Sequence, residues 1–445
     1  MSKSIRKVAA AAAVLLAISL LTACGSNEKS SGNGGNNTLP ENNNTPRGEQ
    51  QGRITNVTSP KFQLSDGFIV PIEKQTNAPD GWVGISTVAE FDKIRLNPSG
   101  KYILLNDIDL SVIEDYKYTN LSGGILDGNA HMVTATNTNV FYLENEAEIK
   151  NLSVVLAGKS LLGSFEDSQI NNCWISGLVQ ADYRNVGTFS GSVSKSTIIK
   201  NCYNTAKLQF DSSFVNSCSP LLPITIGGLV GAVYATDSNI IENSYNAADI
   251  LFDFNFEGEV IVGGIIGEAG DDSIITNCFN AGNIIVNSAK RSSVHGVCGG
   301  YYSSLKSTIE GCFNSGDLEA NCEGGGTIHG LGKGNFTNCY NKGDLKGEFV
   351  IGLGWGNSYE NCYVNGTFSG SDICAVDSKF LKHCYFLDKI ENSTRDGRLL
   401  PDASIKKLTI EQMKDKSSFI GFDFNNVWEM GGTNYPYPVF KAMYS

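Results

Sequence analysis

The sequence is poor in the features that mark several common classes of protein. It has no cluster of Lys and Arg, and its formal net charge of −12 would repel phosphate groups. After the apolar run 8–21, no segment is apolar enough to cross a membrane as a helix. We therefore expect no nucleic-acid partner and no membrane-spanning helix in the body of the protein.

Signatures of common catalytic sites are also missing. There is no G-x-S-x-G sequence, so a serine hydrolase of that class loses its usual mark. Gly158-Lys159-Ser160 matches the end of a phosphate-binding loop, but Ser153 stands where the loop needs glycine. No histidine belongs to an H-E-x-x-H zinc site, and the four are His131, His295, His329 and His383. We expect no catalytic residue, no metal ion and no cofactor.

The N-terminus has the pattern of a secretory signal. Basic residues precede the apolar run 8–21, which is shorter than the roughly 20 residues that span a bilayer. The run ends in Leu21-Thr22-Ala23-Cys24, which resembles the lipobox of bacterial lipoproteins. This resemblance implies that residues 1–23 are removed and that Cys24 carries lipid. The protein is then expected outside the cytoplasm, anchored in a bacterial membrane through Cys24 and exposed at the cell surface.

Residues 24–51 are rich in Gly, Ser, Asn, Glu and Pro and have almost nothing to bury. Such a composition cannot offset the entropy of ordering, so this segment is expected to be a flexible tether. Removing residues 1–23 deletes three positive and no negative charges, which changes the net charge from −12 to −15. We interpret this charge mainly as a source of solubility, and we expect a monomer.

A repeat of the form I-x-N-C-(aromatic)-N-x-G dominates the rest of the chain. Its copies are 29, 42, 34, 34, 27, 23 and 22 residues apart, and an aromatic residue directly follows every cysteine position. Short β-branched runs separated by Gly, Asn and Asp indicate strands and tight turns. The cysteine position is occupied by Cys173, Cys202, Ser244, Cys278, Cys312, Cys339, Cys362 and Cys384.

This period favours a parallel β-helix, because no 3.6-residue helical period is visible. Successive coils stack about 4.8 Å apart, so equivalent residues of neighbouring repeats lie on top of one another. Cysteine, which is usually buried, suits a ladder that points inward, and asparagine side chains can form hydrogen bonds from one coil to the next. The glycine four residues later is expected to allow a bend with positive φ. The longest interval contains the stretch 210–223, which we interpret as an excursion from the coil.

These copies resemble the GLUG motif of bacterial surface proteins, and the segments 102–110, 124–129 and 422–438 resemble the family's lead-in and closing module. The resemblance implies an all-β, right-handed parallel β-helix in an adhesin-like protein. We assign residues 52–148 to an N-terminal cap and first coils, 149–390 to the repeat β-helix and 391–445 to a C-terminal capping module. Within these caps, Thr87-x-x-Glu90 and Thr409-x-x-Gln412 predict short helices, and residues 52–75 are expected to add strands.

Eleven cysteines remain after Cys24. Stacked side chains at coil spacing fit disulfide geometry poorly, so we expect free thiols in the ladder. Four cysteines lie off the ladder, and a bridge among them stays open, namely Cys218, Cys298, Cys322 and Cys374.

The sequence is compatible with two kinds of surface site. If the cysteines point inward, the aromatic residues beside them would line an outer face that could stack on sugars, although a buried structural stack is the competing interpretation. Paired carboxylates, at Asp107 with Asp109, at Asp127, and at Asp271 with Asp272, could serve catalysis or bind calcium, or only form turns. The candidate stacking face consists of Tyr203, Tyr245, Phe279, Phe313, Tyr340 and Tyr363.

Two functions remain open at this point. The preferred one is a non-catalytic, surface-anchored adhesin or interaction protein whose partner is a surface glycan or a protein. The alternative is a carbohydrate-active enzyme, either a polysaccharide lyase or a glycoside hydrolase, or a glycan-binding protein on the same scaffold. Clustered outward acids would favour the enzyme and an acid-poor face the adhesin.

Overall fold

A computed structural model describes residues 69–234, 238–288, 290–300, 306–390 and 405–441. The chain divides into two units, Met1–Gln51 and Gly52–Ser445. The signal segment 1–23 with Cys24, the tether 24–51 and residues 52–68 lie outside the described residues.

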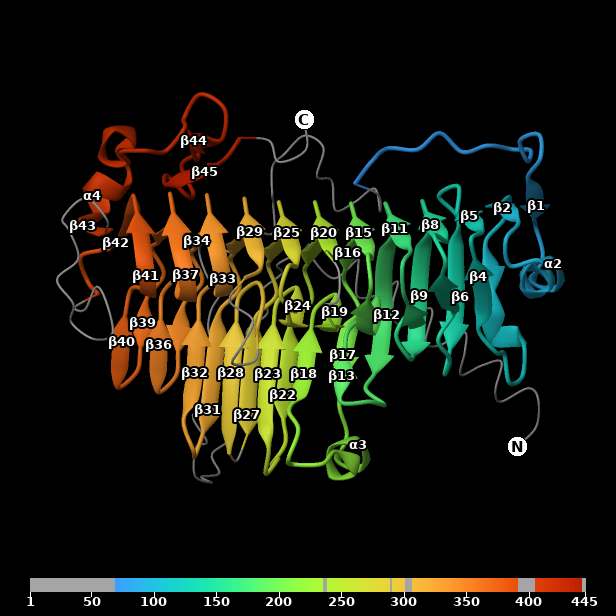
Figure 1. The fold of residues 1–445 in the computed structure, drawn as a ribbon, viewed down its shortest axis with the longest axis horizontal. Helices are drawn as coiled ribbons and strands as arrows, with labels where there is room; N and C mark the ends of the chain where they lie inside the picture. Colours follow the sequence, from blue (N-terminus) through green and yellow to red (C-terminus); the bar gives the residue numbers. More distant parts are fainter. Residues whose placement is uncertain (1–68, 235–237, 289, 301–305, 391–404, 442–445) are drawn as a thin grey trace, which may run out of the picture. The chain divides into compact units, whose positions relative to one another are not determined.

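The described chain is a parallel β-helix. Strands that are far apart in the sequence pair in parallel, one coil on the next (Figure 1). One sheet has twelve strands, so four coils precede the eight that carry the cysteine repeat. Its strands are, in order, β1 (Val83–Ile85), β2 (Lys101–Leu104), β5 (Ile125–Asp127), β8 (Glu148–Lys150), β11 (Gln169–Asn171), β15 (Ile198–Lys200), β20 (Ile240–Glu242), β25 (Ile274–Thr276), β29 (Thr308–Glu310), β33 (Gly332–Thr337), β37 (Gly354–Glu360) and β41 (Asp377–Lys382).

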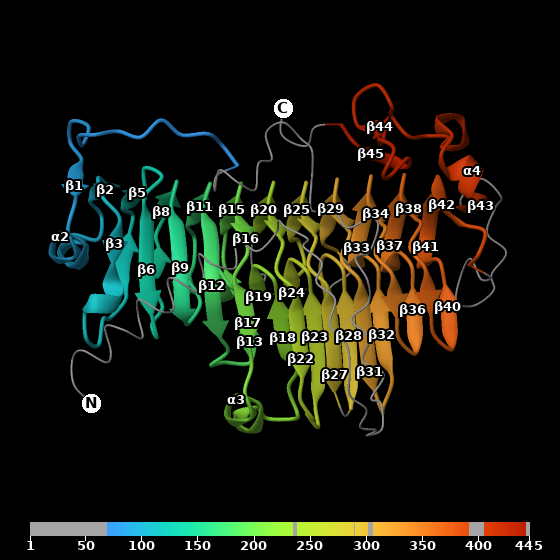
Figure 2. The ribbon, with the colours of Figure 1, turned by 180° about the vertical axis from the view of Figure 1, so that it is seen from behind.

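A second long sheet begins just after the cysteine position of each repeat and is best followed from behind (Figure 2). Its registers pair each aromatic residue with the next, as Tyr203 with Tyr245 and Tyr245 with Phe279. Its strands are β3 (Ile108–Asp109), β6 (Met132–Thr136), β9 (Ser153–Gly158), β12 (Trp174–Gln180), β16 (Tyr203–Asn204), β21 (Tyr245–Asn246), β26 (Phe279–Asn280), β30 (Phe313–Asn314), β34 (Tyr340–Asn341), β38 (Tyr363–Val364), β42 (Cys384–Leu387) and β43 (Ile405–Leu408), with β17 (Lys207–Gln209) beside β12.

Three shorter parallel sheets complete the coils. The first contains β4 (Thr119–Ser122), β7 (Phe141–Glu144), β10 (Leu162–Phe165), β14 (Ser190–Ser194), β19 (Val230–Tyr234) and β24 (Ile266–Glu268). The second contains β13 (Asn185–Val186), β18 (Ile224–Gly227), β23 (Glu259–Gly263), β28 (Arg291–His295), β32 (Gly326–His329), β36 (Phe349–Ile351) and β40 (Asp372–Cys374). The third contains β22 (Ile250–Asp253), β27 (Ile284–Ser288), β31 (Leu318–Cys322), β35 (Leu345–Lys346) and β39 (Phe368–Ser369).

The residue before each cysteine position forms the corner between the two long sheets, and it is asparagine in all copies except those with Gly311 and His383. Asn172 and Asn201 have φ of 55° and 54°, the left-handed region that asparagine tolerates better than most residues. Asn243 and Asn277 repeat this conformation, and their side-chain amides bond from coil to coil. The sequence prediction for asparagine is therefore confirmed at this corner.

The glycine four residues later acts differently from the prediction. Among the later repeats, Gly282 and Gly316 do not have positive φ. A Cβ atom at Gly282 would lie 1.9 Å from the carbonyl oxygen of Ala248, and one at Gly316 would lie 1.9 Å from that of Gly282. Glycine is needed here because neighbouring coils approach too closely for any side chain. Only Gly177, in the first copy, has the expected positive φ, at 96°.

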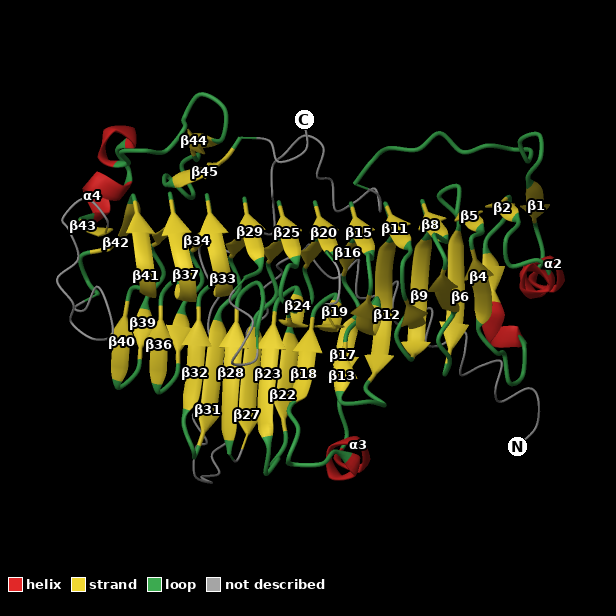
Figure 3. Cartoon of the chain, viewed as in Figure 1, coloured by secondary structure: helices red, strands yellow, loops and turns green. Residues whose placement is uncertain are grey.

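Both predicted capping helices form (Figure 3). Thr87 caps α2 (Val88–Asp92) in a capping box with Glu90, and a 3₁₀ turn, η1 (Lys93–Leu96), follows. Thr409 caps α4 (Ile410–Met413) in the same way with Gln412, ahead of η3 (Lys416–Ser418) and the hairpin β44 (Trp428–Met430) and β45 (Pro438–Phe440). The excursion 210–223 contains a helix, α3 (Ser212–Ser217), which protrudes from the stack.

The expectation of strands near the N-terminus is wrong for residues 69–75. This segment runs across the coils, so it has no strand to pair with along its length. Instead, the Asn172 side chain accepts from the N–H of Val70 and donates to its C=O, at 3.0 and 2.9 Å. Asn129 binds Gln75 in the same way, at 2.7 and 2.8 Å. Corner asparagines thus replace the backbone ladder. In the described part of the chain, no helix is long and apolar enough to span a membrane.

Candidate functional site

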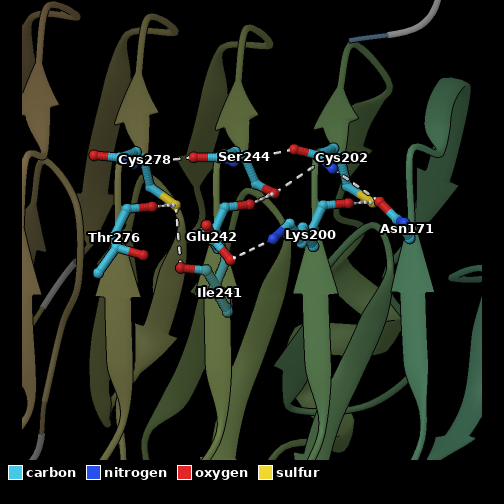
Figure 4. Close-up of polar contacts among 11 residues, drawn as sticks. Asn171, Lys200, Cys202, Ile241, Glu242, Ser244, Thr276 and Cys278 are labelled. Carbon is cyan, nitrogen blue, oxygen red and sulfur yellow. Dashed lines mark hydrogen bonds and ion pairs between the residues drawn. The ribbon is translucent and has the colours of Figure 1, made fainter. Parts of the chain in front are cut away.

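The cysteine ladder points into the core, as the sequence predicted (Figure 4). The Cys202 thiol donates to the Lys200 carbonyl at 3.1 Å, and the Cys278 thiol donates to the Thr276 carbonyl at 3.2 Å. Ser244 takes the cysteine position between them and donates to the Glu242 carbonyl at 2.7 Å. These bonds satisfy carbonyl groups at the sheet corner, so the ladder has a structural role.

The eleven cysteines of the described chain are all free thiols, including the four that lie off the ladder. Burial raises the pKa of Cys298 and of Cys384 to about 12, and it also raises the pKa values of Cys173, Cys278, Cys312, Cys339 and Cys362. Since the thiolate is the reactive form, these groups are chemically inert when folded. Among these eleven described cysteines, only Cys218 and Cys322 are partly exposed.

The predicted aromatic stacking face is wrong as a ligand surface. The rings do stack on one outer side of the coils, with centroids 4.7 Å apart from Tyr203 to Tyr245 and from Tyr245 to Phe279. However, all six candidate residues are at most 2% exposed. Tyr340 packs against Trp428 and Phe440 of the C-terminal module. The face is therefore a second hydrophobic core, which joins Tyr203, Tyr245, Phe279, Phe313, Tyr340 and Tyr363 to Ile69 and to the C-terminal module.

The carboxylates of the lead-in have structural partners. Asp107 accepts from His131 Nδ1 at 2.9 Å and from the Met132 N–H at 3.0 Å. Asp127 accepts from the Asn129 N–H at 2.8 Å and from the Asn151 amide at 3.0 Å. Asp109 caps the 3₁₀ turn η2 (Leu110–Val112). These acids hold turns in place and do not converge on a common point.

The other sequence candidates are also held locally. Asp271 pairs with Lys306 at 3.3 Å, and Asp272 lies in a turn with a φ of 64°. His383 contacts the corner residue Asn361 at 3.2 Å. Within the described ranges, no group of three or more His, Cys, Asp and Glu is placed to hold a metal ion.

A cluster of charged residues that the sequence analysis missed lies on the outer face of the seven-stranded sheet. On β23, Val260 and Val262 point into the core, so Glu259 and Ile261, which alternate with them along the strand, point outward. The next strands place Ser293 beside Ile261, and His295 beside Gly263. His329 follows on β32, with its ring centroid 4.6 Å from that of His295.

Glu268, on β24 of the six-stranded sheet, and Lys333, on β33 of the twelve-stranded sheet, lie near this row. Single parallel bridges join Ile266 to Cys298 and Cys298 to Gly332, which places the starts of β24 and β33 on the coils on either side of Cys298. The Lys333 ammonium donates to the Gly300 carbonyl at 2.8 Å and lies 5.3 Å from the Trp355 ring centroid. We call Arg184, Glu259, Glu268, His295 and Lys333 the charged cluster.

The members of this cluster are wholly or partly shielded from water. Burial is the largest influence on Glu268 and raises its pKa, which Arg184 and Lys333 offset only in part. Burial likewise raises the pKa of Glu259 and lowers that of Lys333. Burial also holds the pKa of His295 well below its usual value, and His329 and Lys333 add to this shift.

Two polar atoms of the cluster are buried without a hydrogen-bond partner, namely Nη1 of Arg184 and Nδ1 of His295. Neither glutamate has a hydrogen bond or an ion pair within 4.0 Å among the described residues. Groups of this kind usually cost stability, so their convergence marks the cluster as the best candidate functional site.

The sequence carries only a faint signal for this cluster. Its members lie between positions 184 and 333 without regular spacing, and only the coil register brings them together. The one available hint is that His295 and His329 take the position that Gly227 and Gly263 hold in the glycine-rich runs of the earlier copies.

Comparisons with known proteins add little. No protein-family model matches the chain, and no curated protein matches it. Among solved structures, it is similar to a provisionally named immunoglobulin A1 protease from Bacteroides ovatus, with 16% identity, a TM-score of 0.29, and coverage of 83% of this chain and 95% of that one. At that TM-score the likeness carries no argument about fold or function.

Proposed function

We propose that the protein is a non-catalytic, surface-anchored interaction protein of the adhesin type, with the GLUG-like repeats as its scaffold. Lipid on Cys24 would hold it to a bacterial membrane, and residues 24–51 would tether the β-helix outside the cell. The partner would be a surface glycan or a protein, and nucleic acid is disfavoured by the net charge.

The observation that supports this proposal is the unbroken stack of coils. Sheets of twelve and thirteen parallel strands hold every outer feature at a fixed spacing of about 4.8 Å along the stack. Such a rigid scaffold limits the entropy lost when a surface binds a partner. Of the carboxylates considered as catalytic candidates, Asp107 and Asp127 accept hydrogen bonds at turns and Asp271 forms an ion pair with Lys306.

The test combines binding and turnover on one protein preparation. The purified chain is applied to a glycan array and to immobilised surface proteins, and the same sample is assayed for release of reducing sugar ends from each bound glycan. We expect retention on at least one surface without product release. Release of sugar ends would instead establish the carbohydrate-active enzyme, and the absence of any retained partner would refute the interaction protein.

A further inference from the structure

The segment 69–75 crosses the coils on asparagines that lie at the corners after successive strands of the twelve-stranded sheet (Figure 1). The Asn172 side chain binds both the N–H and the C=O of Val70. The Asn129 side chain binds both groups of Gln75. Such a clamp recognises the backbone and can hold a residue of any type except proline. We call these corner asparagines the corner row, which consists of Asn129, Asn151, Asn172, Asn201, Asn243 and Asn277.

The two clamps show in which direction, and how steeply, the segment crosses the stack. The clamped residues are five positions apart, and two strand steps, from β5 to β8 and from β8 to β11, separate the clamps. Toward the N-terminus, the chain thus advances to later coils by about 9.6 Å for every five residues. Two further steps lead to β20, whose corner residue is Asn243. The residue five positions before Val70 is Ser65.

The corner at Asn243 resembles the clamp at Asn172. The two residues have left-handed φ values of 49° and 55°. Asn172 donates to Asn151 in the preceding coil at 3.0 Å and holds Val70 as well. Asn243 donates to Asn201 in the preceding coil at 3.1 Å. Since a side-chain amide has two N–H donors and two acceptor positions, a corner of this row can bind its neighbours and a passing backbone together.

The middle of the aromatic stack lies along the same path. Tyr245 and Phe279 stack face to face at 4.7 Å, and each is 1% exposed. Stacking covers ring faces, so this low exposure also requires contacts at the ring edges. Ile69 belongs to this core on one side, and Phe440 of the C-terminal module packs on Phe313 on the other, with ring centroids 6.1 Å apart. The path that continues from Ile69 crosses the coils between these two covers.

The residues that precede Ile69 have side chains suited to covering rings. Residues 52–68 contain five large apolar side chains, whereas the tether 24–51 contains only Leu39. The five are Ile54, Val57, Phe62, Leu64 and Phe68. Because this segment is joined to a residue that is already bound, it loses less freedom on binding than a separate peptide would. The chain's own segment is therefore favoured over a segment of another molecule.

We propose that the corner row also binds residues 60–68 of the same chain, with the backbone of Ser65 held by Asn243. The apolar side chains of this segment cover the middle of the aromatic stack. The tether 24–51 then joins the body near the middle of the stack and not at the N-terminal cap. This inference goes beyond the proposed function and does not depend on it, since it concerns how the chain binds itself.

Hydrogen–deuterium exchange of the full chain, purified in detergent and read by mass spectrometry, tests the proposal. Amides of residues 60–68 should exchange at least about tenfold more slowly than those of residues 28–51. Asn243→Gly removes the clamp and still permits positive φ, so exchange in residues 60–68 should become about tenfold faster. Asn172→Gly removes a clamp that the structure shows, and it should accelerate exchange in residues 69–75 by a similar factor.

Asn361→Gly is the matched control. It removes a corner amide with a φ of 53° from the coil of Tyr363, on which Trp428 of the C-terminal module packs. Its exchange in residues 60–68 should equal that of the wild type.

Hydroxyl-radical labelling of Tyr245 tests the apolar contacts, because a covered ring is labelled slowly. The double variant Phe62→Ser with Leu64→Ser should be labelled several-fold faster at this tyrosine. Leu39→Ser, which removes the large apolar side chain of the tether, should leave the labelling unchanged. Equal labelling in the wild type and the double variant would overturn the proposed cover.

Three further outcomes would overturn the proposal. Exchange in residues 60–68 that is as fast as in the tether, or that Asn243→Gly leaves unchanged, would show that the corner row does not bind this segment. Equal acceleration in β20 and β25 would show that Asn243→Gly only loosens the coils. Protection that is lost on dilution would assign the row to a second copy of the chain. The glycan-array and turnover assays test the interaction protein separately.

Discussion

At the scale of the residue, a row of stacked asparagine side chains, which includes Asn246, Asn280 and Asn314, does much to fix how one coil is aligned on the next. The Asn280 side chain donates to Asn314 Oδ1 at 2.9 Å and accepts from Asn246 Nδ2 at 2.9 Å, while it also donates to the Gly282 carbonyl at 2.7 Å. The residue is fully buried. A gap in such a row leaves both neighbours with unsatisfied groups.

Asn280→Ala should therefore lower the free energy of unfolding by about 2–4 kcal/mol, since each buried group left without a partner costs about 1–3 kcal/mol. Asn321→Ala is the matched control, because Asn321 donates to Asn287 at 2.9 Å in an exposed row. Its cost should stay within about 0.5 kcal/mol. Urea unfolding of both variants measures the difference, and equal costs would refute a special role for the buried row.

Burial also determines which thiols of the folded protein can react. Brief alkylation of the folded protein should label Cys218 and Cys322, which are partly exposed, and leave the buried thiols unlabelled. Alkylation after unfolding, without reduction, should label all eleven cysteines of the described chain. Mass spectrometry reads both states, and thiols that stay blocked after unfolding would reveal disulfides and contradict the free-thiol ladder.

At the scale of the element, the C-terminal module works as a cover for the aromatic stack. Trp428 is fully buried and packs on both Tyr340 and Tyr363, with ring centroids 6.1 Å from each. The module thus closes one outer side of the late coils and shares one hydrophobic core with the aromatic stack.

Trp428→Ala should lower the free energy of unfolding by about 3–5 kcal/mol because it leaves a large cavity over these rings. Phe380→Ala, at a ring that is 69% exposed on β41, should cost less than about 0.5 kcal/mol. Calorimetry compares the two variants. A small effect of Trp428→Ala would mean that the module is not needed to cover the stack.

The sequence was sufficient for features that repeat or act locally. The cysteine ladder, the corner asparagines and the capping boxes at Thr87 and Thr409 were all predicted correctly, because each depends on near neighbours or on one coil meeting the next. The covering of the aromatic stack by Trp428 and the charged cluster could not be predicted. Both depend on contacts between segments with no shared period.

At the scale of the whole molecule, stability should depend on pH. His295 is buried in its neutral form, facing Ser293, His329 and Lys333. Its folded pKa is lowered, so the unfolded chain binds more protons below about pH 6.5 and stability is lost as the pH falls through that value. Glu259 and Glu268 have the opposite effect. Their folded pKa values are raised, so the folded chain binds more protons than the unfolded chain as the pH falls toward about 4.5, and their contribution to stability increases over that range.

The comparison of the wild type with His295→Gln isolates the histidine. Between pH 7.5 and pH 5.5 the wild type should lose more free energy of unfolding than the variant, by at most about 1.4 kcal/mol per pH unit. Urea midpoints at both pH values give this difference. Parallel losses in the two proteins would show that His295 does not control the response.

The most direct measurement of the proposed function compares adherence by cells that carry the wild-type chain, cells that carry Cys24→Ala, and cells without the chain. Each is applied to a surface coated with the glycan or protein that the purified chain retains, and the medium is assayed for released sugar. We predict adherence only with the wild-type chain and no released sugar. Released sugar, or equal adherence by all three, would contradict a lipid-anchored, non-catalytic interaction protein.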